Sequence, residues 1–369
     1  MLDIPDNENE SASIPSDQRL RPEELPEVEP PSARFIVQLF LIPGLIVFAV
    51  VCLWLLFGKL TASPQDIGMT LQDLGSQNPH VSGRAKWNLT YMLIADAKLG
   101  DKGQQLSRNP QIADALASLL IEKVQKISKG KDHLAQQEFL ASALGWVDLP
   151  DKAFPALERT MHIRPEPRSD NPEDQEVRDL QQKIRKSAIA SIARIAGRAA
   201  ERYEQVVRPE LVNELIDVSA DEEPAVRQLA AFCLGLFATQ AAKERLVSLL
   251  IDADKATQMN AAMALARQGS SAGFPVFKTV LRDALKPVDS ASIHGETARE
   301  RDKNTKVQEF ERQIVLKNTL KAVIDLTDRL NADQRTELIN LIDPISKNHS
   351  LLGVRGQARK VLEKLICSD

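Results

Sequence analysis

A short residue pattern recurs from residue 79 to the end of the chain and restricts the possible folds more than any other feature. Its clearest copy spans residues 223–235 and contains Val226-Arg227, Ala230 and Leu234-Gly235. The Val, Ala and Leu positions lie four residues apart, so an α-helix places them on one face. The small Ala in the middle lets a neighbouring helix approach closely. The pattern therefore predicts helices that pack against one another.

Two other copies are clear and three are degenerate. They lie at Ile184, Arg185, Ala188, Ile192 and Ala193; at Val354, Arg355, Ala358 and Leu362; at Pro79, Val81, Ala85 and Leu89; at Gln137, Ala141, Leu144 and Gly145; and at Gln258, Ala261, Ala262 and Leu265. A second amphipathic stretch precedes each copy, as at 209–218. The unit is thus a helical hairpin, and because one hairpin cannot bury its own apolar face, stacked copies must form a continuous core.

The predicted fold class is all-α: an α-solenoid of about seven hairpins over residues 60–369. Two polar stretches, 163–175 and 286–306, are expected to be insertions that form loops between the helices of one pair. Such loops could bind a partner, but we favour the interpretation that they are tolerated insertions without a function. The helix pairs are expected at 64–99, 108–146, 151–204, 208–238, 240–268, 272–329 and 331–367.

The run from Asp221 to Gly235 resembles the second half of a HEAT repeat, in particular the HEAT-like class shared with phycobilisome lyases. The resemblance implies that a turn acid six residues before the Arg ties adjacent hairpins together. Two copies have this combination: Asp221 with Arg227, and Asp179 with Arg185. Two copies lack the link, because Asp252 is followed six residues later by Gln258, and Arg355 is preceded six residues earlier by His349.

Residues 1–57 differ in composition from the repeats. Residues 1–34 hold nine acids and three bases among six prolines, so we expect a disordered acidic tail. Residues 35–57 are an apolar run without charges, and a helix of this length spans about 34 Å, enough for a bilayer core of about 30 Å. A single-pass transmembrane helix is favoured over a buried globular helix or a cleaved signal peptide, because the run is long and follows an acidic segment.

The membrane orientation depends on the flanking bases. Arg19, Arg21 and Arg34 precede the apolar run, and only Lys59 closely follows it. This asymmetry favours an N-terminus inside and a solenoid outside.

Motifs for catalysis are missing from the sequence. The five histidines are scattered, and no Cys-x-x-Cys, G-x-S-x-G or phosphate-binding glycine motif occurs. No His precedes Glu, which disfavours the metal site of the HEAT-like di-iron hydroxylases. Cys233 and Cys367 both fall on expected core faces, so neither is a candidate nucleophile. We expect no enzyme activity, no metal and no cofactor.

One basic stretch stands out from a nearly neutral domain. Residues 59–369 hold 44 bases and 42 acids, so nucleic acid is an unlikely partner. Within 181–208, Arg194, Arg198 and Arg202 recur at a spacing of four, which aligns them on one helix face. They are the candidate anion-binding or partner-binding ridge; the alternative, which is favoured, is a helix face whose Arg stems cover the neighbouring hairpin.

These features predict a membrane-anchored, non-catalytic scaffold that binds another protein, whose identity the sequence does not specify. The alternative from a different class is a lyase-type or accessory HEAT-like protein that acts on a tetrapyrrole or a modified protein.

Overall fold

The computed structural model describes residues 41, 44, 45, 47–52, 67–126, 128–202, 204, 208–287 and 297–367. The chain divides into two compact units, Met1–Pro64 and Gln65–Asp369. In the described ranges every regular element is a helix, as expected for an all-α protein.

The described residues of the unit Gln65–Asp369 form seven helical hairpins, each corresponding to one of the predicted helix pairs. They are α2 (Ile67–Leu74) with α3 (Pro79–Leu99), α4 (Pro110–Gln125) with α5 (Lys131–Leu144), α6 (Pro150–Met161) with α7 (Pro172–Glu201), α8 (Pro209–Val218) with α9 (Pro224–Leu234), α10 (Gln240–Leu249) with α11 (Lys255–Arg267), α12 (Phe274–Asp283) with α13 (Ala298–Leu326), and α14 (Ala332–Asn348) with α15 (Leu352–Ile366). Short 3-10 turns lie at Gly100–Lys102, Leu106–Arg108, Ser271–Gly273 and Thr327–Arg329.

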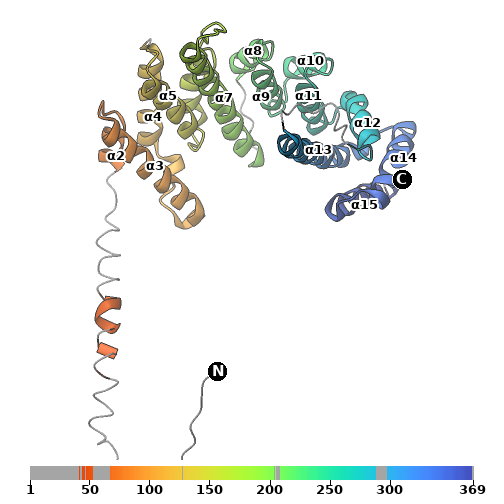
Figure 1. Ribbon diagram of the computed structural model, residues 1–369, viewed down its shortest axis with the longest axis horizontal. Helices are drawn as coiled ribbons and strands as arrows, with labels where there is room; N and C mark the ends of the chain where they lie inside the picture. Colours follow the sequence, from red (N-terminus) through yellow and green to blue (C-terminus); the bar gives the residue numbers. More distant parts are fainter. Residues whose placement is uncertain are drawn as a thin grey trace, which may run out of the picture. The chain divides into compact units, whose positions relative to one another are not determined.

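The hairpins stack into two layers of helices. Odd-numbered helices pack on the next odd-numbered helix, from α5 through α7, α9 and α11 to α13 and α15, and even-numbered helices form the other layer. Within this unit, Figure 1 shows α9, α11, α13 and α15 along the inner side of the row. We call the odd-numbered set the inner helices.

Helix starts follow from local chemistry. Proline occupies the first turn of several helices, where its missing N–H costs nothing because that donor has no partner inside the helix. The side chains of Asn78, Asn109 and Asn171 accept hydrogen bonds from backbone N–H groups of the first turn. Asp254 caps α11 in the same way by accepting from Thr257 N.

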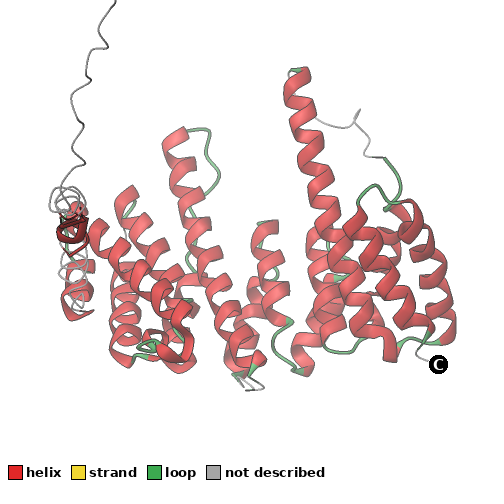
Figure 2. Ribbon diagram, turned by 90° about the horizontal axis from the view of Figure 1, so that it is seen from below, coloured by secondary structure: helices red, strands yellow, loops and turns green. Residues whose placement is uncertain are grey.

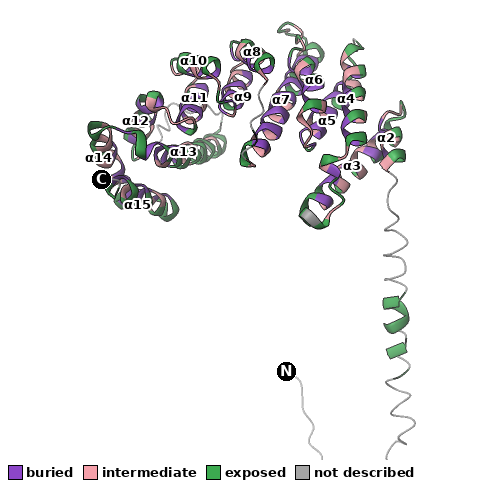
Figure 3. Cartoon of the chain, turned by 180° about the vertical axis from the view of Figure 1, so that it is seen from behind, coloured by how far each residue is buried: buried purple, intermediate pink, exposed green. Residues whose placement is uncertain are grey.

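The apolar core forms two main clusters that meet at α11, and Figure 3 shows buried residues along the contacts between helices. Ala261, Ala264 and Leu265 belong to the first cluster, which extends back to Leu74. Met259, Ala262 and Ala266 belong to the second, which extends to Leu365. One short helix therefore supplies both cores from different faces.

The two expected insertions are loops only in part, so those predictions were wrong in extent. α7 begins at Pro172, which leaves 162–171 as the connection, and α13 begins at Ala298. Both helices extend beyond their neighbours, as Figure 2 shows for the longest helices. Asn171 and Thr297 cap these starts, and Lys306 pairs with Asp302 one turn away. Capping and side-chain pairs support the first turns of these helices, which bury little apolar surface.

The predictions for the N-terminal unit fall mainly outside the described residues. The acidic tail 1–34 lies wholly outside them, and of the expected transmembrane helix 35–57 only residues 41, 44, 45 and 47–52 are described, all helical and exposed. Among described residues, no helix has both the length and the apolar character needed to span a bilayer.

Candidate protein-interaction face

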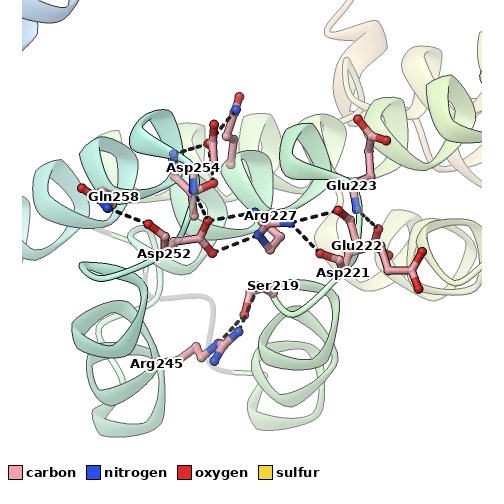
Figure 4. A network of polar contacts seen from close by, with 11 residues as sticks. Ser219, Asp221, Glu222, Glu223, Arg227, Arg245, Asp252, Asp254 and Gln258 are labelled. Carbon is pink, nitrogen blue, oxygen red and sulfur yellow. Dashed lines mark hydrogen bonds and ion pairs between the residues drawn. The ribbon is translucent and has the colours of Figure 1, made fainter.

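A ladder of polar contacts joins successive hairpins at the turns between their helices (Figure 4). Arg227 on α9 donates from Nε to Asp252 Oδ2 at 2.9 Å and from Nη2 to Asp252 Oδ1 at 2.8 Å. Its Nη1 donates to the backbone oxygen of Asp221 at 2.9 Å. The guanidinium therefore binds its own turn through backbone and the next turn through a carboxylate.

The preceding rung has the same form. Arg185 on α7 donates to Asp221 Oδ2 at 2.5 Å and to the backbone oxygen of Met161, the last residue of α6, at 3.0 Å. Asp179 lies within α7, where its carboxylate accepts from Gln175. The expected Asp179–Arg185 link is thus absent, because the acid that meets each Arg comes from the following hairpin.

The ladder stops at the third rung. Gln258 on α11 donates to the backbone oxygen of Asp252 at 2.6 Å, which reproduces the contact within one turn. Gln258 cannot form the ion pair that Arg227 forms, so this copy gives no ionic link to the following hairpin. Its acid Asp252 is nevertheless linked to Arg227 of the preceding hairpin, so the expectation that this copy lacks the link was wrong in that respect.

The ladder acids are ionised more readily in the fold than in a free side chain. The hydrogen bond from Arg227 lowers the pKa of Asp252 against the effect of burial. Burial opposes ionisation of Asp221, but hydrogen bonds from Arg185 and the backbone N–H of Glu223 hold its pKa below the usual range. The carboxylates therefore act as structural anions.

The candidate ridge Arg194, Arg198 and Arg202 lies against the end of α5 and the turn after it. Arg198 donates to the backbone oxygens of Gly145 at 2.9 Å and Val147 at 2.7 Å, and Arg194 donates to that of Ser142. Backbone carbonyls at the end of α5 and in the turn after it thus receive donors from the next inner helix.

Asp148 completes this contact. Arg202 approaches both of its carboxylate oxygens, at 3.1 and 3.0 Å, and Arg108 Nε lies 3.1 Å from Oδ2. Burial opposes ionisation of Asp148, yet hydrogen bonds from Arg108 and Arg202 lower its pKa. The ridge arginines are aligned as expected, and they fasten α7 to the preceding hairpin.

A partly exposed strip of aromatic, Met and Arg side chains lies on the inner helices. Phe232 lies five residues after Arg227, and Met263 lies five residues after Gln258, the equivalent position of the next repeat. Arg194 and Arg267 lie nine residues after that position in their own repeats. Equivalent repeat positions put them on equivalent faces. With Trp146, which comes directly after α5, they form what we call the inner strip: Trp146, Arg194, Phe232, Met263 and Arg267.

Two cation–π contacts organise this strip. The Arg267 guanidinium carbon lies 4.9 Å from the ring centre of Phe232, and that of Arg194 lies 5.8 Å from Trp146. Phe232 and Trp146 remain 37% and 40% exposed. Each ring is thus held by a cation from the next inner helix but keeps an open face. Aromatic residues and Arg dominate the energetics of protein interfaces, so the strip suits recognition of a protein.

Two features of the described residues bear on catalysis: the grouping of side chains that could bind a metal, and the cysteine thiols that could act as nucleophiles. No cluster of three His, Cys, Asp or Glu side chains that could hold a metal occurs among the described residues. Cys233 is fully buried, and burial raises the pKa of its thiol. Cys367 is exposed at the end of α15, so its expected core position was wrong. The last turn of the helix leaves this residue beyond the packed face.

Comparison with known proteins supports the repeat class. Residues 209–295, which include α8 to α12, match the family model of HEAT repeats. This segment of the helical scaffold therefore carries HEAT repeats, although the match spans less than half of the chain. No curated protein matches the sequence significantly.

Solved structures show only a distant similarity. An engineered protein has 15% identity and a TM-score of 0.39, covering 69% of this chain and 97% of its own. Escherichia coli YibA has 16% identity and a TM-score of 0.38, covering 81% and 93%. Human deoxyhypusine hydroxylase in complex with glycerol has 13% identity and a TM-score of 0.29, covering 84% and 98%. These scores are too low to support an argument about function.

Sequence reasoning identified the ridge arginines but missed the inner strip. The sequence contained a signal for the inner strip in two repeats. Phe232 and Met263 occupy the same repeat position, and both are large apolar residues that lie outside the Val–Ala–Leu face. A large apolar side chain that recurs off the core face indicates a surface used for contact. The corresponding residue of α7 is the small Ala190, so the signal does not extend to that helix.

Proposed function

We propose that the protein is a non-catalytic scaffold whose inner strip binds a segment of another protein. The exposed rings of Phe232 and Trp146, each stacked with an Arg from the next inner helix, carry this proposal. A helical scaffold with HEAT repeats is consistent with such a role.

The chemistry of the strip specifies the class of partner. The open ring faces of Trp146 and Phe232 and the side chain of Met263 favour aliphatic or aromatic groups. Arg194 and Arg267 add positive charge beside these apolar groups, so a carboxylate next to an apolar anchor would be recognised. The partner segment is therefore amphipathic and acidic.

Membrane attachment through residues 35–57 is part of the same proposal. The 23-residue apolar run motivates it, and the flanking bases favour a solenoid on the outer side. Protease digestion of intact cells and of inverted vesicles tests the orientation. Loss of the Gln65–Asp369 unit in intact cells supports the proposed side, and protection there with digestion in inverted vesicles contradicts it.

Site-specific photo-cross-linking of the full chain in its native membranes tests the proposed binding face. A benzoylphenylalanine at position 232 is expected to form a discrete adduct with one protein. The matched control is position 247, because Val247 lies on α10 in the other helix layer and is 44% exposed, close to the exposure of Phe232.

The adduct should disappear when Trp146→Ala and Met263→Ala are combined with the photo-reactive residue at 232, while the helical content stays unchanged. Equal adducts at 232 and 247, or an adduct that persists in this variant, would show that the inner strip does not select the partner.

A further inference from the structure

The first inner helix, α3, carries a second exposed stripe whose composition differs from the inner strip. Trp87 is 81% exposed, Tyr91 is 72% exposed and Ile94 is 37% exposed. Arg84 and Lys98 lie on the same face, since all five recur every three or four residues. We call Arg84, Trp87, Tyr91, Ile94 and Lys98 the α3 stripe.

The aromatic side chains of the α3 stripe have open polar tips. Among the described residues, neither Trp87 nor Tyr91 makes a hydrogen bond or stacks with a cation, in contrast to Trp146 and Phe232. An amphipathic ring with an apolar body and a free N–H or O–H suits the boundary between hydrocarbon and water.

The charge on this face has one sign. The acid that pairs with Arg84 is distant, because Asp73 Oδ2 lies 3.8 Å from Arg84 Nη2. Lys98 is exposed. The one acid of α3, Asp96, is buried on the opposite face, where its carboxylate accepts hydrogen bonds from the backbone N–H groups of Gln104 and Leu106. The stripe therefore presents cations to any surface that covers it, and an anionic surface complements it.

Along the chain, the hairpin that carries the α3 stripe is the first one after the proposed anchor. Nine residues separate Phe57, the last residue of the apolar run, from Ile67, the first residue of α2. A connection of this length spans at most about 35 Å. If residues 35–57 cross a bilayer, α3 belongs to the hairpin that the connection keeps closest to the headgroups.

We infer that the α3 stripe lies in the headgroup region of a bilayer that contains anionic lipid. The stripe sets the first hairpin on the membrane and leaves the inner strip free for a protein. This inference rests on the proposed anchor for its full effect, although the stripe itself is a property of the Gln65–Asp369 unit.

Fluorescence of single-tryptophan variants tests the inference. The chain has three Trp, so Trp54→Phe combined with Trp146→Phe leaves Trp87 as the reporter, and Trp54→Phe combined with Trp87→Phe leaves Trp146 as the matched control. Each full-length variant is reconstituted into vesicles of equal parts phosphatidylcholine and phosphatidylglycerol, with and without bromine on the upper acyl chain. Bromine should quench Trp87 strongly and Trp146 little.

Charge is tested on the isolated Gln65–Asp369 unit, which has hydrophobic cores of its own. The unit should sediment with the same vesicles, and Arg84→Glu combined with Lys98→Glu should weaken this binding about tenfold or more, because each base near an anionic surface contributes about 1 kcal/mol. Lys183→Glu combined with Lys347→Glu is the control with the same charge change on exposed residues of other helices.

The outcomes separate this inference from the proposed anchor. If the full chain floats with vesicles but bromine quenches Trp87 no more than Trp146, the α3 inference is overturned and the anchor stands. If the full chain binds the vesicles no more tightly than the isolated unit, and bromine still quenches Trp87, the α3 inference stands and the anchor fails. If a co-purified protein shields Trp87 and lipid does not, the α3 stripe binds a protein partner and the inference is overturned.

Discussion

Arg227 and Asp252 form a two-pronged ion pair between neighbouring hairpins, with side chains only 14% and 10% exposed. Both carboxylate oxygens accept from the same guanidinium, at 2.9 and 2.8 Å. This geometry is the strongest form of charge-assisted hydrogen bond in proteins. The pair joins two turns that are 25 residues apart in sequence, so it fixes the register of one hairpin on the next.

We expect Asp252→Asn to lower the free energy of unfolding by about 1–3 kcal/mol, because one partner of a largely buried pair loses its counter-charge. Urea unfolding of the Gln65–Asp369 unit measures this change. Glu122→Gln is the control, since Glu122 pairs with Lys126 at an exposed position, where the side chains are 51% and 60% exposed, and exposed pairs contribute about 0–1 kcal/mol. Equal losses in the two variants would contradict the assigned role.

The ladder acids should make the fold sensitive to acid. The folded-state pKa values of Asp221, Asp252 and Asp148 lie below the ordinary value. Their contribution to stability is therefore present above the unfolded pKa of about 4 and is lost as the pH falls from there through the lower folded pKa.

Urea midpoints measured between neutral pH and about pH 3 should fall for the wild-type unit. They should fall less for Asp252→Asn, which has already lost one of these groups. A wild-type midpoint that rose on acidification, or identical slopes for both proteins, would refute the linkage.

The ridge arginines should matter for stability. Arg198→Met keeps most of the stem but removes both donors from the backbone oxygens of Gly145 and Val147, and unsatisfied buried acceptors cost about 1–3 kcal/mol. Lys183→Met on the same helix should have little effect, because Lys183 is 61% exposed. Thermal unfolding followed by circular dichroism compares the two variants. A ridge that only bound anions would leave both midpoints unchanged.

Glycine at the end of α9 should resist substitution. A Cβ at Gly235 would lie 2.5 Å from the Cβ of Ala264 on α11, too close for packed atoms. Gly235→Ala should therefore destabilise the unit by about 1–3 kcal/mol. Gly356→Ala is the matched control: nothing lies within 4 Å of its added Cβ, and a helical Ala stabilises by about 0.5–1 kcal/mol relative to Gly. Opposite signs are expected in denaturation curves.

Sequence periodicity predicted the seven helix pairs because every hairpin must bury an apolar face. That requirement places apolar residues four positions apart in the sequence. It failed at the starts of α7 and α13, where a projecting helix buries little and caps such as Asn171 and Thr297 decide its extent. The polar composition of these two helix starts predicted loops instead.

The polar contacts were harder to predict for a geometric reason. The resemblance matched Asp221 with Arg227, six residues later, as a link between adjacent hairpins, but it did not show that each carboxylate of the ladder binds the Arg of the preceding hairpin. Likewise, the spacing of Arg194, Arg198 and Arg202 showed their shared face, whereas the carbonyls that they bind lie about 50 residues earlier and leave no local signal.

The sharing of α11 between two cores has a mechanical consequence. The ionic ladder runs through Arg185 and Arg227 and ends at Gln258, so the hairpins before α11 are joined by both apolar packing and ion pairs. Beyond α11, α13 packs on α11 through the second core, and an ion pair between Lys278 and Glu337 joins α12 to α14. If the array is pulled from its two ends, we expect the part that begins at α11 to extend first, because its described residues form fewer ion pairs between neighbouring hairpins.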